Sequence, residues 1–336
     1  MKNFIIFCML IMSMTLFYSC SSGDTKSGNS LVIYCSHPLD LMNTILDDFK
    51  AKNPNINVEV VTAGTGELLK RVEAEKMNPL GDVLWGGTLN SVKSKTDLFE
   101  SYTSTNEANI LDEFKNTEGP FTRFSAIPSI LMVNTNLAGN IKIEGYEDLL
   151  NPALKGKIAA ADPSASSSAF EHLVNMLYAM GKGDPEKGWD YVQKLCANLD
   201  GKLLSGSSAV YKGVADGEYA VGLTYEEPGI SYMSSGSPVK VVYMKEGVIS
   251  KPDGVYIIKG GKNLENAKKF IDYCVSLDAQ NMLVEKLSRR AIRNDAVVTD
   301  IVKPMSEIYS ITDNADVVEE SRQKWLDKFK DIFTSI

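Results

Sequence analysis

Residues 31–85 read LVIYCSHPLDLMNTILDDFKAKNPNINVEVVTAGTGELLKRVEAEKMNPLGDVLW. Along this stretch, segments with the hydrophobic pattern of a strand alternate with segments that have the pattern of a helix. Short runs rich in β-branched and aromatic residues, typical of strands, lie at 31–34, 56–61 and 82–85. In the intervals between these runs, apolar residues recur at helical spacing, namely Leu41, Ile45, Leu46 and Phe49, then Leu68, Leu69 and Val72. This order of strands and helices predicts a parallel sheet whose ligand-binding loops lie at the carboxyl ends of the strands.

A second set of strands and helices follows, and the chain then becomes mainly helical towards its end. Two α/β sets of similar size predict two lobes with a cleft between them, joined where the chain crosses near 125–128 and 242–252. The predicted fold class is α/β, and each lobe is expected to be a mostly parallel sheet flanked by helices. In this division lobe 1 comprises 31–126 and 243–290, lobe 2 comprises 127–242, and 291–336 forms C-terminal helices that pack on the lobes.

The composition is that of a globular, acidic chain. Across 336 residues, 35 Lys and Arg stand against 43 Asp and Glu, which gives a formal charge of −8. An acidic chain without a basic block is a poor candidate for binding nucleic acid, so we expect no nucleic-acid partner. Two histidines exclude a site built on several imidazoles. Five cysteines are too few for a disulfide scaffold, and we expect buried free thiols at Cys35 and Cys274.

The N-terminus has the pattern of an export signal. One positive charge precedes an apolar run over 4–18, which is short for a bilayer-spanning helix. The run ends at Ser19 and Cys20, in a pattern similar to the bacterial lipoprotein box, where the cysteine becomes the lipidated N-terminus after cleavage. We predict a signal peptide over 1–19, a palmitate-bearing Cys20 and a flexible Gly- and Ser-rich tether over 20–30. A plain signal peptide or an uncleaved anchor is the alternative.

Serine clusters lie at the predicted starts of two helices in the second lobe. The stretch DPSASSSAF places Ser166, Ser167 and Ser168 where a strand gives way to a helix, and the stretch SGSS places Ser207 similarly. Backbone N–H groups, a helix dipole and hydroxyls at such a point suit an anion. The alternative is that these serines only cap their helices.

Other polar residues follow predicted strands that should end in the cleft. Tyr225 and Glu226 offer a phenolate and a carboxylate, which are hard oxygen ligands suited to ferric iron and also able to hold sugar hydroxyls. An ordinary polar loop is the alternative for this pair. His37 closes the first strand, where ligands bind in such sheets. Gly87 follows the third strand and permits close approach of the backbone.

Signatures of enzymes are missing from the sequence. It contains no Walker loop, no HExxH, no CxxC and no GxSxG elbow. We therefore expect a binding protein and not an enzyme. An exported phosphate-ester hydrolase that uses the serine loops, and a surface adhesin with an incidental cleft, are the rival classes.

With these residues in view, the chain resembles bacterial extracellular solute-binding proteins of the ferric-iron-binding group over nearly all of 31–336. The markers of this resemblance are Val32-Ile33-Tyr34 leading to His37, Asp82-Val83, Ser167-Ser168-Ala169-Phe170, and Gly217-Glu218-Tyr219-Ala220 running into Tyr225. The resemblance implies a type II periplasmic-binding-protein clamshell that passes its ligand to an ABC permease and its ATPase at the inner membrane. It implies export as well, and we expect a monomer held by its lipid at the periplasmic face of a membrane.

The resemblance also implies ligands. Iron-binding members use His, Glu and two adjacent Tyr, with an anion at a serine-rich helix start. His37 lies one position before the family histidine, and Gly87 stands where the glutamate would be. Tyr225 matches the first tyrosine and Glu226 replaces the second. The anion site is matched by Ser167, Ser168 and Ser207.

Ferric iron is therefore the expected ligand, held by His37, Tyr225 and Glu226, with phosphate or carbonate as the accompanying anion. A phosphorylated sugar or a phosphonate is the alternative. A related branch of the family binds such solutes, and the loop of Tyr225, Glu226 and Glu227 suits them.

Overall fold

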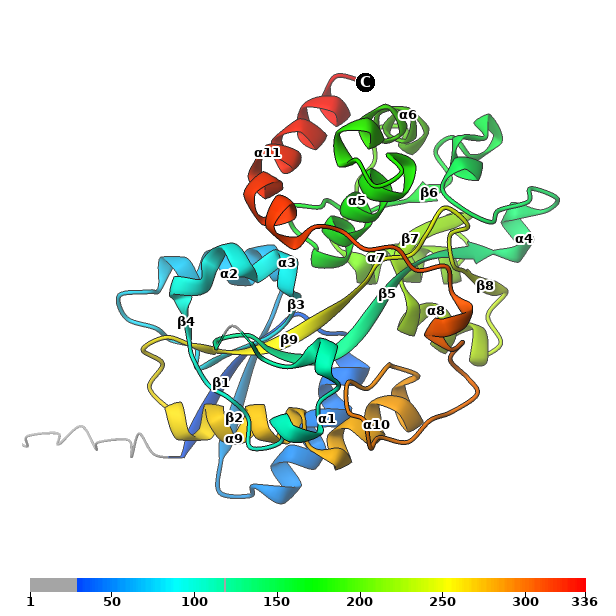
Figure 1. The fold of residues 1–336 in the computed structure, drawn as a ribbon. Helices are drawn as coiled ribbons and strands as arrows, with labels where there is room; N and C mark the ends of the chain where they lie inside the picture. The colour runs from blue at the N-terminus through cyan, green and yellow to red at the C-terminus, as the bar shows by residue number, and fades with distance from the viewer. Residues whose placement is uncertain (1–28, 118) are drawn as a thin grey trace, which may run out of the picture.

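The structure is a computed structural model that describes residues 29–117 and 119–336 (Figure 1). Its strands are β1 (Ser30–Cys35), β2 (Asn57–Thr62), β3 (Val83–Thr88), β4 (Phe99–Glu100), β5 (Thr122–Asn134), β6 (Ile158–Ala159), β7 (Val221–Tyr225), β8 (Val239–Val242) and β9 (Ser250–Ile258). They form one sheet in the order β2-β1-β3-β9-β5-β7-β6, and β4 pairs with β9 while β8 pairs with β5. A single sheet therefore runs through the whole described molecule.

Helices cover this sheet at both of its ends. They are α1 (Leu39–Lys52), α2 (Thr65–Ala74), α3 (Leu89–Val92), α4 (Thr135–Ala138), α5 (Ser167–Met180), α6 (Trp189–Leu199), α7 (Ser207–Ala215), α8 (Glu226–Ser234), α9 (Leu264–Cys274), α10 (Leu277–Leu287) and α11 (Ala315–Thr334). In Figure 1, α1, α9 and α10 lie at one end of the molecule, and α5, α6 and α11 lie at the other.

The first part of the chain folds as its hydrophobic periods predict. β1 pairs in parallel with both β2 and β3, and α1 and α2 make the connections. The apolar face of α1, which includes Leu41, Ile45 and Phe49, is buried against this sheet. Burial of such a face is the main stabilising contribution of a helix of this length.

Two long strands carry the chain between the lobes. The first half of β5 pairs with β9, from Thr122 opposite Val255 to Pro128 opposite Ser250. The second half, from Ser129 onward, pairs instead with β7 and β8. Figure 1 shows β5 and β9 running together through the middle of the molecule, so the two lobes share these strands.

The expectation of mostly parallel sheets is wrong. Among the described strands, only the β1–β2, β1–β3 and β6–β7 pairings are parallel. β5 and β9 run antiparallel to each other, because the chain leaves the first lobe along one and returns along the other. Every strand that pairs with β9 is antiparallel to it, so the sheet is mixed.

Separate hydrophobic cores lie at the two ends of the sheet. Trp85, Phe49 and Phe270 belong to the core of the first lobe. Residues of the second-lobe core include Phe170, Leu177, Trp189, Val248, Ile249, Trp325 and Phe329. Val248 and Ile249 belong to the second core, and β9 begins directly after them at Ser250, within the range 242–252 expected for the return crossing. The last helix, α11, contributes to the second core and packs against α6.

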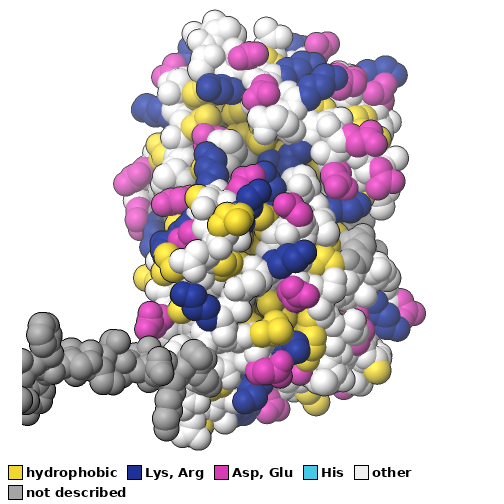
Figure 2. Space-filling model, turned by 90° about the vertical axis from the view of Figure 1, so that its left-hand side faces the viewer, with side chains coloured by type: hydrophobic (Ala, Val, Ile, Leu, Met, Phe, Trp, Pro, Cys, Tyr) yellow, Lys and Arg dark blue, Asp and Glu magenta, His cyan; other side chains and the backbone are white. Residues whose placement is uncertain are grey.

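The predicted signal peptide, Cys20 and nearly all of the 20–30 tether lie outside the described residues, and remain predictions. No helix in the described part of the chain is long and apolar enough to cross a bilayer. Acidic and basic side chains are interspersed over the face shown in Figure 2, without a single-sign patch.

Candidate functional site

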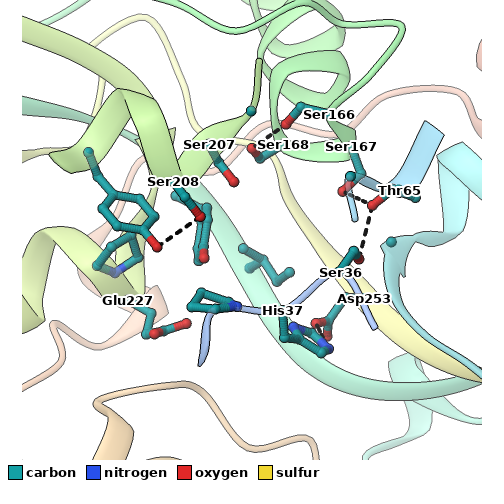
Figure 3. Close-up of a pocket in the computed structure, with 18 of the residues that line it drawn as sticks. Ser36, His37, Thr65, Ser166, Ser167, Ser168, Ser207, Ser208, Glu227 and Asp253 are labelled. Atoms are coloured by element: carbon teal, nitrogen blue, oxygen red, sulfur yellow. Dashed lines mark hydrogen bonds and ion pairs between the residues drawn. The ribbon is translucent and has the colours of Figure 1, made fainter. Parts of the chain in front are cut away.

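A cavity of about 810 Å³ lies between the two lobes. The first lobe lines it with residues after β1, with the end of β3 and with the start of α2. The second lobe contributes the end of β7 and the starts of α5, α7 and α8. Figure 3 shows serine and threonine hydroxyls gathered on one side of this space, and Glu227, His37 and Asp253 on the other.

The serine side begins at α5. Ser166 is the N-cap of this helix, since its hydroxyl accepts a hydrogen bond from the amide of Ala169 at 3.4 Å. The hydroxyls of Ser166 and Ser168 are 3.2 Å apart, and Ser167 and Ser168 occupy the first turn of the helix. All three serines line the cavity. Ser166 thus has the capping role that was the alternative interpretation, whereas Ser167 and Ser168 cap no helix.

A second helix start lies beside it. α7 begins at Ser207, after the extended Gly206, and no side chain caps it. Ser207 lines the cavity, and Ser208 accepts a hydrogen bond from the hydroxyl of Tyr211 at 3.1 Å. The first amides of a helix have no partner within the helix. The uncapped start of α7 therefore leaves donors available at the cavity wall.

The first lobe adds a third helix start. Thr65, the first residue of α2, donates its hydroxyl to Ser36 at 3.0 Å and to Ser167 at 3.4 Å. The amide of Gly66 donates to the carbonyl of Ala165 at 3.1 Å, across the two lobes. A Cβ atom on Gly66 would collide with the carbonyl oxygen of Ser164, so glycine is required for this approach. Three helix N-termini therefore meet around one side of the cavity, and their dipoles favour a negative charge there.

Gly87 serves a related purpose on β3. Its φ of 83° is in the region that favours glycine, and a Cβ atom there would lie 2.6 Å from Cγ2 of Thr65. The hydroxyl of Tyr256 donates to its carbonyl at 2.9 Å. Gly87 lines the cavity and lets α2 approach β3 closely.

The opposite side of the cavity holds a buried charge cluster. The guanidinium of Arg289 pairs with the carboxylates of Glu227 and Asp253, at 2.5 Å for Asp253, and its Nε donates to the hydroxyl of Ser125 at 2.7 Å. Burial raises the pKa of Glu227 to about 7, against the lowering influence of Arg289. Burial acts to lower the pKa of Arg289, but the two carboxylates outweigh it and raise that pKa. Arg289 thus stays charged between its carboxylates.

His37 lies beside this cluster. Its ring packs edge-on against Trp85 with centroids 4.9 Å apart, and its Nε2 is 3.5 Å from a carboxylate oxygen of Asp253. Burial, and secondarily the charge of Arg289, hold the pKa of His37 well below its ordinary value of 6.5. Nε2 is buried without a hydrogen-bond partner. The imidazole is therefore neutral, and its Nε2 is buried beside Asp253.

The predicted ligand Glu226 faces away from the cavity, and this part of the prediction is wrong. Both of its carboxylate oxygens accept hydrogen bonds at 2.7 Å from the guanidinium of Arg290, and one also accepts the hydroxyl of Tyr243 at 2.6 Å. The reason is that α8 begins at this residue, and successive side chains of a helix point about 100° apart. Glu227, the next residue, lines the cavity in its place.

Tyr225 does line the cavity at the end of β7. Burial raises its pKa well above the ordinary value, and the charge of Glu227 adds to this effect. The phenol is therefore protonated at neutral pH. The structure thus brings His37 and Tyr225 to one cavity but does not bring Glu226 to it. In the described residues, no group of three or more His, Cys, Asp and Glu side chains is arranged to hold a metal ion.

Several residues of the cavity were missed from the sequence. Thr65 was not singled out, and Glu227 was named only within the loop that suits a phosphorylated solute. Arg289 and Asp253 lie far along the chain from the other site residues, and no local motif surrounds them. Only the pairing of β9 with β3 and β5 brings Asp253 to the cavity.

Comparisons with known proteins agree with this architecture. The family model of the bacterial extracellular solute-binding proteins matches residues 44–307. The periplasmic binding protein AfuA from Actinobacillus pleuropneumoniae, solved with exogenous fructose-6-phosphate bound, is 26% identical with a TM-score of 0.84, over 91% of this chain and 99% of AfuA. The ferric binding protein from Campylobacter jejuni is 20% identical with a TM-score of 0.74, over 90% of this chain and 99% of that one.

A further relative is the putative 2-aminoethylphosphonate-binding periplasmic protein of Salmonella typhimurium, which is 24% identical over 86% of this chain and 82% of its own length. The predicted α/β, two-lobed, type II periplasmic-binding-protein fold is confirmed by the structural matches. The matching family consists of transport proteins, and its description as extracellular implies export. This chain belongs to the bacterial extracellular solute-binding proteins, and it is a periplasmic solute-binding protein of an ABC transporter.

Proposed function

We propose that this chain is the solute-binding lipoprotein of an ABC importer and that it captures a phosphorylated small organic molecule in the interlobe cavity. The observation that carries this proposal is the meeting of three helix N-termini, those of α2, α5 and α7, on one side of the cavity. The uncapped start of α7 and the hydroxyls of Ser167, Ser168 and Ser207 suit the oxygens of a phosphate or phosphonate.

The rest of the cavity suits an organic body attached to that group. About 810 Å³ is within the range of cavities that hold small organic ligands and is far more than a phosphate group fills. Glu227 and Asp253 line the cavity and offer carboxylate oxygens to hydroxyl donors. Tyr211 adds aromatic surface together with Tyr225 and Tyr232, whose ring centroids lie 6.4 and 5.9 Å from its own. One end thus suits an anion and the other a polar ring or chain.

The comparisons support the same class of ligand. AfuA, at 26% identity, was solved with fructose-6-phosphate, and the Salmonella relative is named for a phosphonate. Both of these ligands join a phosphorus oxyanion to a small organic body. We infer a ligand of this kind without choosing between a sugar phosphate and a phosphonate.

Ferric iron with phosphate or carbonate, the ligand expected first from the sequence, is the second candidate, and the name of the Campylobacter protein supports it. Fe³⁺ requires several anionic oxygen donors. Here Glu226 is paired with Arg290, and Arg289 holds a positive charge beside Glu227. These contacts favour a phosphorylated solute over ferric iron.

The rest of the proposal follows from the family. We propose delivery to a permease and its ATPase, a lipid anchor on Cys20, and a monomer. An enzyme that hydrolyses phosphate esters would need an activated serine, but neutral His37 is held beside Asp253 and Trp85, across the cavity from the serines (Figure 3).

Titration calorimetry tests the ligand class. Fructose 6-phosphate, 2-aminoethylphosphonate, inorganic phosphate and ferric citrate are each titrated into the purified protein, with and without a metal chelator. We expect saturable 1:1 binding of one of the two organic compounds, unaffected by chelator and without turnover. A visible charge-transfer band with ferric citrate that is lost in Tyr225→Phe, together with no binding of either organic compound, would overturn the proposal in favour of iron.

A further inference from the structure

A buried carboxyl on α5 is shared between the two lobes. Glu171 belongs to the second lobe and is 4% exposed. Its two oxygens accept hydrogen bonds from first-lobe residues, from the hydroxyl of Thr88 at 2.5 Å and from the side-chain amide of Asn90 at 3.1 Å. Thr88 ends β3 and Asn90 lies in α3, so both donors leave Glu171 when the lobes separate.

The charged and titratable groups around Glu171 come from several elements. Lys251 of β9 is paired with Asp313, which precedes α11 and also accepts a hydrogen bond from Asn90 at 3.2 Å. Arg322 of α11 lies over the ring of Phe170 at 4.3 Å, and its Nε donates to the carbonyl of Asn90 at 3.3 Å. Tyr256 of β9 and His172 of α5 are further titratable neighbours. The side chains that hydrogen-bond directly to Glu171 are therefore neutral donors, and the charged side chains lie around these donors.

Burial raises the pKa of Glu171 to about 7, and the charge of Asp313 adds to it. The hydrogen bonds from Thr88 and Asn90 and the charge of Lys251 act in the opposite direction and are outweighed. When the lobes part, water reaches the carboxyl and its pKa returns towards the ordinary value of 4.5. The closed arrangement therefore binds a proton that the open arrangement releases between these two pH values.

We propose that Glu171 is a positioning residue for lobe closure, whose carboxyl takes up a proton as Thr88 and Asn90 close over it. Because protonation favours the closed state, closure is strengthened as the pH falls from about 7 towards 4.5 and is weakened as it rises. Acidification then tightens retention of a solute in the cavity. The inference rests on two-lobed solute binding but is independent of which solute is bound.

The test uses the protein without ligand, because a phosphate monoester itself titrates near pH 6. Small-angle X-ray scattering gives the fraction of closed molecules between pH 8 and pH 5.5. We expect the closing equilibrium constant of the wild type to rise about tenfold or more over this range. Glu227 and Asp253 are also buried cavity carboxyls with raised pKa values, so the effect of Glu171 is measured as the difference between wild type and Glu171→Gln.

Glu171→Gln keeps the shape of a neutral carboxyl and should flatten this pH dependence, with a closed fraction at pH 8 above that of the wild type. Thr88→Val removes one donor and should lower the closed fraction at every pH. Glu59→Gln, an exposed change on β2, is the control and should follow the wild type. Equal pH profiles for wild type and Glu171→Gln would overturn the proposal. Scattering of the free protein decides this question even if calorimetry finds no phosphorylated ligand.

Discussion

Neighbouring serines at the start of α5 have different partners, and this allows their roles to be separated. Ser166 caps the helix through its hydroxyl, whereas Ser167 and Ser168 line the cavity without capping it. An N-cap contributes to the stability of its helix, and a hydroxyl that meets a bound anion contributes to affinity. Substitutions at adjacent positions should therefore affect different measured quantities.

We expect the combined change of Ser167, Ser168 and Ser207 to Ala to weaken binding of the phosphorylated ligand by about 1–3 kcal/mol, because it removes hydrogen bonds to a charged group. Ser166→Ala, as the matched control, should lower the free energy of unfolding by about 1 kcal/mol through loss of the cap. Calorimetry and urea denaturation measure the two quantities. Unchanged affinity in the triple variant would leave all four serines as structural residues.

Substitution of Arg289 should show how much charge pairing at the cavity contributes to the free energy of unfolding. Arg289→Met leaves the carboxylates of Glu227 and Asp253 buried without their cation. At pH 8 we expect unfolding free energy to fall by about 3–5 kcal/mol, as when one partner of a buried pair is removed. At pH 5 the loss should be smaller, because burial raises the pKa of both carboxyls, to about 7 for Glu227, and protonation removes part of the unpaired charge.

Urea denaturation at both pH values measures this effect. The control is Arg71→Met, which removes an ion pair with Glu75 on the surface of α2 and should cost below about 1 kcal/mol at either pH. An equal loss at pH 8 and pH 5 in Arg289→Met would contradict the electrostatic explanation.

Individual site residues were predictable where local sequence places them at the end of a strand or the start of a helix. His37, Gly87 and Tyr225 were found in this way, as were the serines. The prediction that Glu226 is a ligand was wrong, because a helix begins at that residue and turns its side chain away from the cavity. Arg289 could not be found, because its position depends on the packing of residues distant in the chain. A cluster of this kind leaves no hydrophobic period and no motif in the sequence.

At the scale of elements, the start of α2 is the contact that brings the lobes together on the serine side. Gly66 has no side chain, and its amide reaches the carbonyl of Ala165 on the opposite lobe. Gly66→Ala should lower ligand affinity at least about tenfold, because the added methyl group collides with the backbone at Ser164 and holds the lobes apart. The melting temperature should change little, since Ala is a better helix former than Gly.

Calorimetry and thermal denaturation check this prediction. Lys70→Ala, an exposed change on the same helix, is the control and should retain the affinity of the wild type. Wild-type affinity in Gly66→Ala would mean that the contact with Ala165 is not needed for the ligand-bound state.

The elements of residues 31–85 were predictable because their hydrophobic periods agree with their burial. The full length of β9 was not, since Pro252, Asp253 and Gly254 are poor strand formers and are typical of a loop. In the structure these three residues pair with β5, opposite Ala126, Ser125 and Arg123 in that order. Tertiary pairing overrides local preference there, and it is the same pairing that makes the sheet mixed.

At the scale of the whole molecule, the C-terminal helix belongs to one lobe. Trp325 of α11 is fully buried in the core of the second lobe, together with Phe329. Trp325→Ala should lower the free energy of unfolding by about 3–5 kcal/mol, because a large buried side chain is removed and a cavity is left.

Hydrogen exchange of backbone amides should show which part of the molecule is destabilised in Trp325→Ala. Amides of α5 and α6 should exchange faster in Trp325→Ala, whereas those of β1 and β2, in the other core, should be changed little. The control is Phe333→Ala, nearer the exposed end of the same helix, which should cost less. Uniformly faster exchange throughout both lobes would show that the two cores unfold as one unit.

The place of β9 in the sheet governs the order in which the molecule can fold. β9 lies between β3 and β5, yet it is synthesised after the whole second lobe up to β8. Until Ser250–Ile258 is available, β3 has an open edge on one side and the first half of β5 lacks the strand it pairs with. The first lobe therefore cannot be completed until the chain has passed through β8 and closed a very long loop, and such closures are slow. A delay of this kind keeps the nascent chain unfolded for longer, which is the state in which an exported protein is threaded through a secretion channel.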